Sequence, residues 1–369
     1  MKLYKIWTLF DAACKSKLAI GMCCLLLASA FVVGCGSDEE TDEHDEHDHA
    51  EAFDATTMLN DFANGLVLPI YTDLDNKAGE LLAAVKALKS DTSQGTLEKA
   101  QQAWVAARIP WEQSEAFLFG PVDTQGLDPA LDSWPVDHVN LQSVLDSGDP
   151  LTVDFVGGLE DTQKGFHTIE FLLFREGDQR QASDITDREL KYLVSTTENL
   201  KASTSQLQSA WAPGGENFAS AVAQAGTGSV VYPSQSAAVQ EIVNGMIVIA
   251  DEVANGKISD PYNESDTTLV ESQFSFNSIA DFQNNIRGIQ NVYGKGLNGF
   301  VNGQDPALDA RFQQEVQAAI SAIGAIPDPF RDSITANRGA VQAAIDAVST
   351  VQLTLEQNIL PLVQSSEFN

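Results

Sequence analysis

Residues 278–294, SIADFQNNIRGIQNVYG, show the spacing of apolar side chains that indicates the fold class. Their apolar side chains recur at intervals of three and four residues, at Ile279, Phe282, Ile286, Ile289 and Tyr293. That interval is the period of one helix face. Ser278 and Asp281 have the spacing of a capping box, and Gly294 stands where a helix commonly stops. The stretch therefore predicts an amphipathic helix with one buried face.

The same helical spacing recurs along most of the chain, and no sustained alternation of apolar and polar residues predicts a strand. We expect helices in the first half around 66–88, interrupted at Pro69, and around 97–107. A further helix is expected at 186–211, and in the second half we expect helices at 234–256, 305–323 and 341–359. The predicted fold is all-α and built as two helical bundles, residues 52–212 and 213–369, divided at Ala212-Pro213-Gly214-Gly215. Residues 120–158 are expected to form a long loop.

The N-terminus has the features of a secretory signal. Basic residues precede an apolar run from Leu18 to Val33, which at 16 residues is short for a membrane-spanning helix. Val32-Val33-Gly34-Cys35 resembles the lipobox of bacterial lipoproteins. This predicts a signal peptide at 1–34, a lipidated Cys35, and an anchored chain in the bacterial cell envelope. Gly36-Ser37 after the cysteine favours the outer membrane. The alternative is an ordinary signal peptide with an unmodified cysteine.

The composition of the 369 residues favours cations as ligands. The chain has 52 acidic and 21 basic side chains and a formal net charge of -31, which repels phosphate backbones and argues against nucleic acid. Residues 35–51 are acidic almost throughout and predict a disordered tether. Three tether histidines, His44, His47 and His49, could bind metal loosely, or the segment is only a solvated spacer.

Residues 165–174, GFHTIEFLLF, carry the most informative polar pair. His167 and Glu170 are three residues apart, so on a helix both side chains project from one face. Their neighbours are strongly apolar, and a buried imidazole or carboxylate is costly unless it is paired or bound to metal. Gly165 lets another backbone come close. The two readings are a metal site and a buried His–Glu hydrogen bond without ligand.

GFHTIEFLLF resembles the GxHxxE motif of the imelysin-like proteins, which include iron-regulated bacterial surface proteins and a lipoprotein component of iron uptake. Other segments are similar to the family in the same order: 108–121 (RIPWEQSEAFLFGP), Trp134-Pro135, 271–278 (ESQFSFNS) and 291–294 (NVYG). The resemblance implies two four-helix bundles that arose by duplication, with the GxHxxE residues near the domain interface.

One imidazole with several carboxylates is an oxygen-rich ligand set that suits iron or manganese. We predict His167, Glu170 and Glu115 as metal ligands. Arg108 precedes Glu115 by seven residues, a spacing that places both on similar helix faces if the helix continues through Pro110. Its guanidinium could bind an anion such as the carboxylates of a chelator, or form a structural ion pair with Glu115.

Four further polar residues are secondary candidates. Asp123 and Asp137 either complete the metal shell or cap helices. Ser275 and Asn277 lie in the motif-like stretch of the second half and could line the interface.

The predicted function is that of an envelope-anchored lipoprotein that binds iron or an iron complex during iron acquisition, with components of iron transport as partners. This is a binding protein and not a catalyst. One alternative is a metal-dependent peptidase, with zinc as the metal and Glu170 as the catalytic residue. However, the sequence has no HExxH, and beyond the tether its histidines are His138 and His167. The other alternative is a surface scaffold with a structural His–Glu pair.

Overall fold

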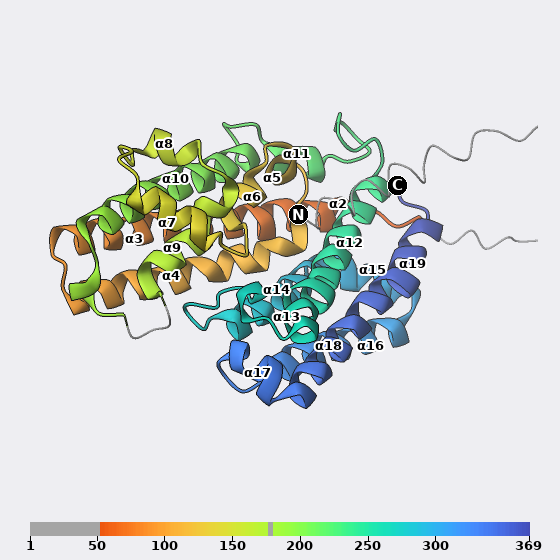
Figure 1. Cartoon of the computed structure of the whole chain (residues 1–369). Coiled ribbons are helices and arrows are strands. Elements are labelled where there is room, and N and C mark those ends of the chain that lie inside the picture. Colours follow the sequence, from red (N-terminus) through yellow and green to blue (C-terminus); the bar gives the residue numbers. More distant parts are fainter. Residues whose placement is uncertain (1–51, 176–179) are drawn as a thin grey trace, which may run out of the picture. The chain divides into compact units, whose positions relative to one another are not determined.

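The computed structural model describes residues 52–175 and 180–369 (Figure 1). The predicted signal peptide, Cys35 and the acidic tether lie outside the described residues. Within them the chain forms helices and no strand; one isolated parallel bridge joins Phe53 and Phe368. The all-α prediction is confirmed. No helix among the residues described has both the length and the apolar character needed to cross a membrane.

The first half of the chain is built on three long helices. α3 (Leu68–Ser90) packs on α4 (Gln94–Ser114) and on α10 (Asp187–Trp211), and the short, fully buried α9 (Gly165–Phe174) packs on α4 and α10. The remaining helices of this half are α2 (Thr56–Phe62), η2 (Ala63–Val67), η3 (Glu115–Phe117), α5 (Pro121–Thr124), α6 (Leu127–Asp132), α7 (His138–Asp146), α8 (Val153–Gly157), η4 (Asp161–Gln163) and η5 (Ala182–Asp184).

The second half packs α12 (Gln235–Asp251), α14 (Ser278–Val292), α16 (Pro306–Gly324) and α18 (Arg338–Thr354) against one another. Its other helices are α11 (Phe218–Ala223), η6 (Glu252–Ile258), α13 (Ser259–Glu264), η7 (Thr267–Leu269), η8 (Tyr293–Leu297), α15 (Asn298–Gln304), α17 (Phe330–Ala336), η9 (Leu355–Ile359) and α19 (Leu360–Ser365). α14 also packs on α4, so this contact joins the two halves. The predicted duplication and the boundary at Pro213 stay predictions.

Several predicted helix ends are confirmed. Thr186 and Glu189 form a capping box at the start of α10, and the side chains of Ser234 and Asp305 cap α12 and α16. The capping box predicted at Ser278 is wrong, because Ser278 Oγ donates instead to the backbone carbonyl of Glu271 at 2.5 Å. The helix also does not stop at Gly294: it continues as the π-helical η8 and turns at Gly296, whose φ is 118°.

Two prolines interrupt their helices less than expected. Pro69 lies in the first turn of α3, directly after the π-helical η2, and the chain stays helical on both sides of it. Proline fits a first turn because its missing N–H would have no partner there. Pro110 lies inside α4, which continues to Ser114. The loop predicted at 120–158 is wrong, since short helices α5 to α8 occupy much of it.

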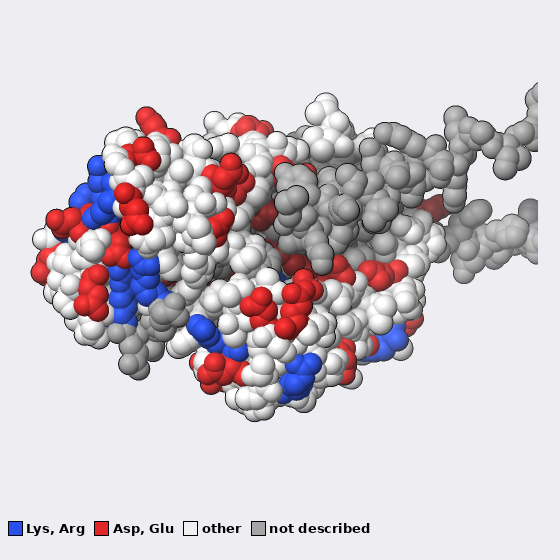
Figure 2. Space-filling model, viewed as in Figure 1, with Lys and Arg blue, Asp and Glu red and all other residues white. Residues whose placement is uncertain are grey.

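The surface keeps the acidic character of the sequence. Figure 2 shows Asp and Glu side chains scattered over the described part of the visible face, with Lys and Arg gathered in fewer places. A field of this sign attracts cations and repels anions.

Candidate metal centre

Gly165 brings two helix ends together at the candidate site. Its φ is +76°, and a Cβ at this position would lie 2.4 Å from the backbone oxygen of Leu131. Only glycine permits this approach of the start of α9 to the end of α6. Asp132, the last residue of α6, therefore lies beside His167 in the first turn of α9.

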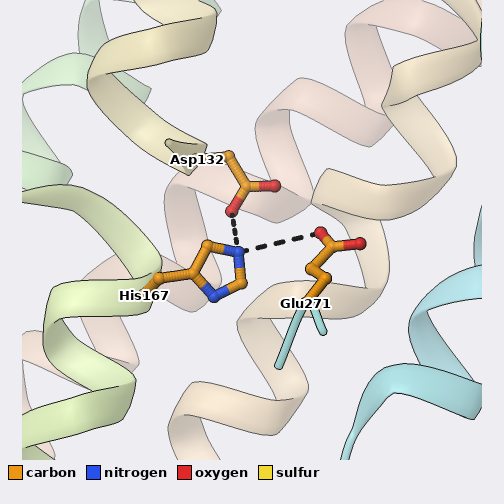
Figure 3. Close-up of side chains that lie close together, drawn as sticks. All are labelled: Asp132, His167 and Glu271. Atoms are coloured by element: carbon orange, nitrogen blue, oxygen red, sulfur yellow. Dashed lines mark ion pairs between the residues drawn. The ribbon is translucent and has the colours of Figure 1, made fainter. Parts of the chain in front are cut away.

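His167 is held by an acidic residue on each side of its ring. Its Nδ1 lies 3.0 Å from Oε2 of Glu170, as the three-residue spacing predicts. Its Nε2 lies 3.2 Å from Oδ1 of Asp132 and 3.7 Å from Oε1 of Glu271. Figure 3 shows both of these carboxylates pointing at that ring nitrogen. The imidazole is 2% exposed.

Glu170 is fully engaged by the protein. While Oε2 faces His167, Oε1 accepts hydrogen bonds from the backbone N–H groups of Phe274 and Ser275 at 3.0 and 2.8 Å, and from Ser275 Oγ at 2.8 Å. Because a carboxylate only accepts, Nδ1 of His167 carries a proton. Glu170 thus fixes both the orientation and the tautomer of the imidazole, which is the usual task of a residue behind a metal ligand.

Arg108 of α4 is fully buried and lies within ion-pair distance of four acidic residues, Glu112, Asp132, Glu271 and Asp281. It pairs with Glu112 and Asp132, and its Nη2 donates to Oε1 of Glu271 at 2.8 Å. The rings of Trp104 and Phe166 lie 5.7 and 5.2 Å from its guanidinium carbon. Arg108 does pair with an acidic residue of α4, but the partner is Glu112 and not Glu115.

Lys257 is the second buried cation of the cluster, and it was not among the predicted site residues. It lies in the π-helical η6 and donates to Oε2 of Glu115 at 2.7 Å. Its Nζ also lies 3.1 Å from Oε2 of Glu271 and 3.4 Å from Oε2 of Glu112. Glu115 is therefore part of the cluster, but Lys257 separates it from His167.

The other predicted residues divide into two groups. Ser275 contacts Glu170, and Asn277 donates to Oδ1 of Asp281 at 2.7 Å, so both belong to the site. The structure does not bring Asp123 or Asp137 to it. Asp123 is exposed on α5, and Asp137 caps α7 by accepting from the backbone N–H of Asn140 at 2.9 Å.

Acidic groups outnumber basic ones in this cluster. Arg108, Lys257 and His167 are surrounded by six buried carboxyl groups: Glu112, Glu115, Asp132, Glu170, Glu271 and Asp281. Burial raises the pKa of Asp281 and Glu115 well above the usual range, with Glu112 adding to the effect at Glu115. The raised pKa values mean that Asp281 and Glu115 hold protons readily, and these protons offset part of the excess negative charge. The cluster therefore favours an added positive charge.

The two carboxylates that face Nε2 stay ionised. At Asp132, burial opposes ionisation, but the charges of Arg108 and His167 outweigh it and lower the pKa. At Glu271, the charge of Lys257 and the neighbouring His167 ring likewise overcome burial and lower the pKa to about 2. Burial disfavours an imidazolium at His167, but Asp132 and Glu170 outweigh this effect and raise its pKa. A proton or a metal cation on Nε2 would thus lie between two anions.

This ligand set fits a first-row divalent metal. Among the residues described, Asp132, His167 and Glu271 each offer a ligand atom within 4.8 Å of the others. His167 Nε2 is buried and makes no hydrogen bond within the described part of the chain. One imidazole nitrogen and two carboxylate oxygens suit iron or manganese. Asp132 and Glu271 were not predicted as ligands, although Glu271 opens the 271–278 segment and Asp132 precedes Trp134-Pro135 by two residues.

The comparisons with known proteins agree with the motif. The sequence model of the family described as Imelysin matches residues 67–355. "Iron-regulated protein A" of Synechococcus elongatus is 32% identical over 361 residues, which cover 94% of each chain. A crystal structure described as an iron-regulated protein A precursor, from Parabacteroides distasonis, has 29% identity and a TM-score of 0.77, over 84% of this chain and 94% of that one.

An imelysin-like protein from Psychrobacter arcticum shares the fold at 14% identity. Its TM-score is 0.70, over 84% of this chain and 95% of that one. The family match covers both halves of the described structure, including α4, α9 and the 271–278 segment that form the cluster. This chain belongs to the imelysin family.

Proposed function

We propose that this chain binds iron, as a divalent cation, between His167, Asp132 and Glu271, and that it serves iron acquisition. One observation carries the proposal. The Nδ1 proton of His167 points to Glu170, so a neutral ring would turn the lone pair of Nε2 toward two ionised carboxylates. That arrangement is repulsive unless a positive charge lies between them, and either a proton on Nε2 or a metal ion that replaces it supplies this charge. The name of the Synechococcus relative, an iron-regulated protein, supports iron as that charge.

The burial of the site favours a bare ion over an iron complex. The side chains of Asp132 and Glu271 are 1% and 0% exposed, and Arg108 and Lys257 fill the adjoining space. When bound, the metal would link α6, α9 and the 271–278 segment through their charged groups. Asp132 and Glu271 would supply anionic oxygens. His167 would lose its Nε2 proton, so that this nitrogen could bind the metal.

Binding agrees with the geometry better than peptide hydrolysis does. A hydrolytic metal site needs an open position for water and a general base that is free to accept a proton. Glu170, the predicted catalytic residue of the alternative, already accepts hydrogen bonds on both oxygens. We therefore expect no chelator-sensitive cleavage of an unfolded protein substrate. Such cleavage, lost in Glu170→Gln, would favour the peptidase.

Anchoring in the bacterial envelope is the second part of the proposal. The lipobox-like Val32-Val33-Gly34-Cys35 supports a lipid on Cys35 that holds the protein to a membrane, with the acidic segment as spacer. Metabolic labelling with a radioactive fatty acid should mark the chain in cells and fail to mark Cys35→Ser. Equal labelling of the parent chain and of Cys35→Ser would contradict the lipid anchor.

The metal proposal is tested by titrating the full chain with ferrous iron under anaerobic conditions, followed by calorimetry. The tether histidines are replaced in all samples (His44→Ala, His47→Ala, His49→Ala), so that they do not add binding. His167→Ala should abolish the high-affinity site. His138→Ala is the matched control, because His138 is exposed and outside the cluster. Equal binding by the two variants would refute the proposed site.

A further inference from the structure

The buried cluster raises the question of how an ion reaches it. Asp132, His167, Lys257 and Glu271 are almost completely shielded from solvent. On the Nδ1 side of His167, Glu170 fastens the segment that covers the site through its hydrogen bonds to the backbone of residues 274 and 275. That side is therefore closed by strong local bonds. On the Nε2 side lie Asp132 of α6 and Lys257 of η6, and each of these two elements carries a second acidic residue.

On α6 an acidic residue lies one turn outward from the site. Asp128 precedes Asp132 by four residues, so the two share a face of the helix. Asp132 is buried, whereas Asp128 is half-buried. The helix thus places one carboxyl group in the cluster and a second nearer to solvent.

η6 repeats this arrangement with a different helical period. Glu252 precedes Lys257 by five residues, and the π-helical turn brings residues at this separation over one another. Lys257 is buried in the cluster, and Glu252 is half-buried. Each element therefore has a half-buried carboxyl group one turn from the buried cluster: α6 leads to the proposed ligand Asp132, and η6 leads to Lys257, which contacts the proposed ligand Glu271.

The pKa values of the two outer carboxyl groups are both raised. Burial, followed by the charge of Asp132, raises the pKa of Asp128 to about 6. Burial raises the pKa of Glu252 to about 7, where Lys257 opposes it and Asp128 adds to it. The charge of Lys257 acts on the pKa of both groups, so both lie within electrostatic range of its ammonium group. Near neutral pH their negative charge lacks full compensation, which favours a passing cation.

Trp134 covers the same side. It follows Asp132 by two residues, is half-buried, and places its ring 5.2 Å from Lys257 Nζ. The centroids of its ring and of the His167 ring are 6.4 Å apart. The half-buried indole therefore lies against two charged members of the buried cluster.

We propose that the divalent cation reaches the buried site between α6 and η6, drawn in by Asp128 and Glu252 and passing Trp134. This inference rests on the proposed function, because it requires the cation site at His167. A second observation points to a ligand at the inner end of the path, since Nε2 of His167 is buried there without a hydrogen bond within the described residues. Asp128 and Glu252 are positioning residues for access and are not ligands of the bound ion.

The test separates rates from affinity. Stopped-flow fluorescence follows the binding of ferrous iron, and its release to a chelator, in the full chain with the tether histidines replaced. The double variant Asp128→Asn, Glu252→Gln should slow association about tenfold, the lower end of the effect of a charged approach on such rates. Release should slow by a similar factor, so that the equilibrium affinity hardly changes. Asp346→Asn, which removes an exposed charge on α18, is the matched control and should leave both rates nearly unchanged.

Other outcomes overturn the inference. Unchanged rates in the double variant would show that the ion takes another path. Weaker equilibrium binding with unchanged association would show that Asp128 or Glu252 acts on the bound ion. If the parent chain shows no binding that His167→Ala removes, the proposed function itself fails and the access path with it. Trp134→Ala should accelerate both association and release, and slower association in that variant would also contradict the path.

Discussion

Replacing Glu170 with glutamine separates an orienting residue from a metal ligand. The amide keeps one oxygen, which can still accept from the backbone N–H groups of Phe274 and Ser275 and from the Ser275 hydroxyl. The NH₂ group then faces Nδ1 of His167, where it can only donate. The imidazole must turn Nδ1 into an acceptor, and its proton moves to Nε2. The nitrogen that faces Asp132 then has no lone pair for a metal.

The size of the effect follows from the bonds that change. The hydrogen bond to His167 persists but loses its charged partner, which should lower the free energy of unfolding by about 1 kcal/mol, the difference between a charged and a neutral hydrogen bond. Loss of a residue that orients a ligand typically lowers metal affinity roughly 10–100-fold, or about 1.4–2.7 kcal/mol. Urea unfolding of the metal-free protein measures the first quantity, and anaerobic calorimetry with ferrous iron measures the second.

Ser275→Ala is the matched control for this prediction. It removes a single hydroxyl donor to Oε1 of Glu170 and leaves the backbone donors and the His167 contact in place. We expect a stability loss of about 1 kcal/mol and unchanged iron affinity. If Glu170→Gln binds iron as tightly as the parent chain, the tautomer argument is wrong. If it loses binding as completely as His167→Ala, Glu170 is itself a ligand, as the sequence predicted.

Three further perturbations test the charge network and its packing. Arg108→Met leaves several carboxylates without their buried partner and should destabilise the fold by about 3–5 kcal/mol in urea unfolding; a loss below about 1 kcal/mol would contradict that partnership. Glu189 pairs with Arg180, and its pKa is lowered to about 2, since backbone and Arg contacts outweigh burial. Its folded pKa lies below the unfolded value, so its stabilisation is present above about pH 4.5 and is lost as the pH falls toward 2. The stability difference between the parent chain and Glu189→Gln should therefore shrink over that window, and a constant difference would refute the pairing. Gly165→Ala should destabilise the protein and weaken iron binding together, because its Cβ would push the Leu131 backbone away; unaltered thermal unfolding would contradict the close approach.

Local periodicity made the fold class predictable. The spacing from Ile279 to Tyr293 and the capping box at Thr186 describe single helices, which depend on residues close in sequence. The ends of helices were less predictable. Ser278 has the spacing of a cap, but it donates to the carbonyl of Glu271 within the buried cluster. Tertiary hydrogen bonds thus replaced the local pattern at this position.

The site was predictable only where its geometry is local. His167 and Glu170 meet because they are one helical turn apart. Asp132 and Glu271 come from distant parts of the chain, and their approach depends on how α6, α9 and the 271–278 segment pack. Lys257 lies in a π-helical segment whose period the search for helical spacing does not recognise. The role of Lys257 depends on carboxylates that the fold brings to it, so the sequence around Gly256 does not indicate that role.

The proposed function depends on a metal ion that binds Nε2 of His167 between Asp132 and Glu271. Anomalous diffraction at the iron absorption edge, from crystals of the protein loaded anaerobically with ferrous iron, tests it most directly. We predict one strong anomalous peak within bonding distance of Nε2 and of an oxygen of each carboxylate. Iron-loaded crystals with no peak there, or with the iron bound elsewhere on the chain, would contradict the account.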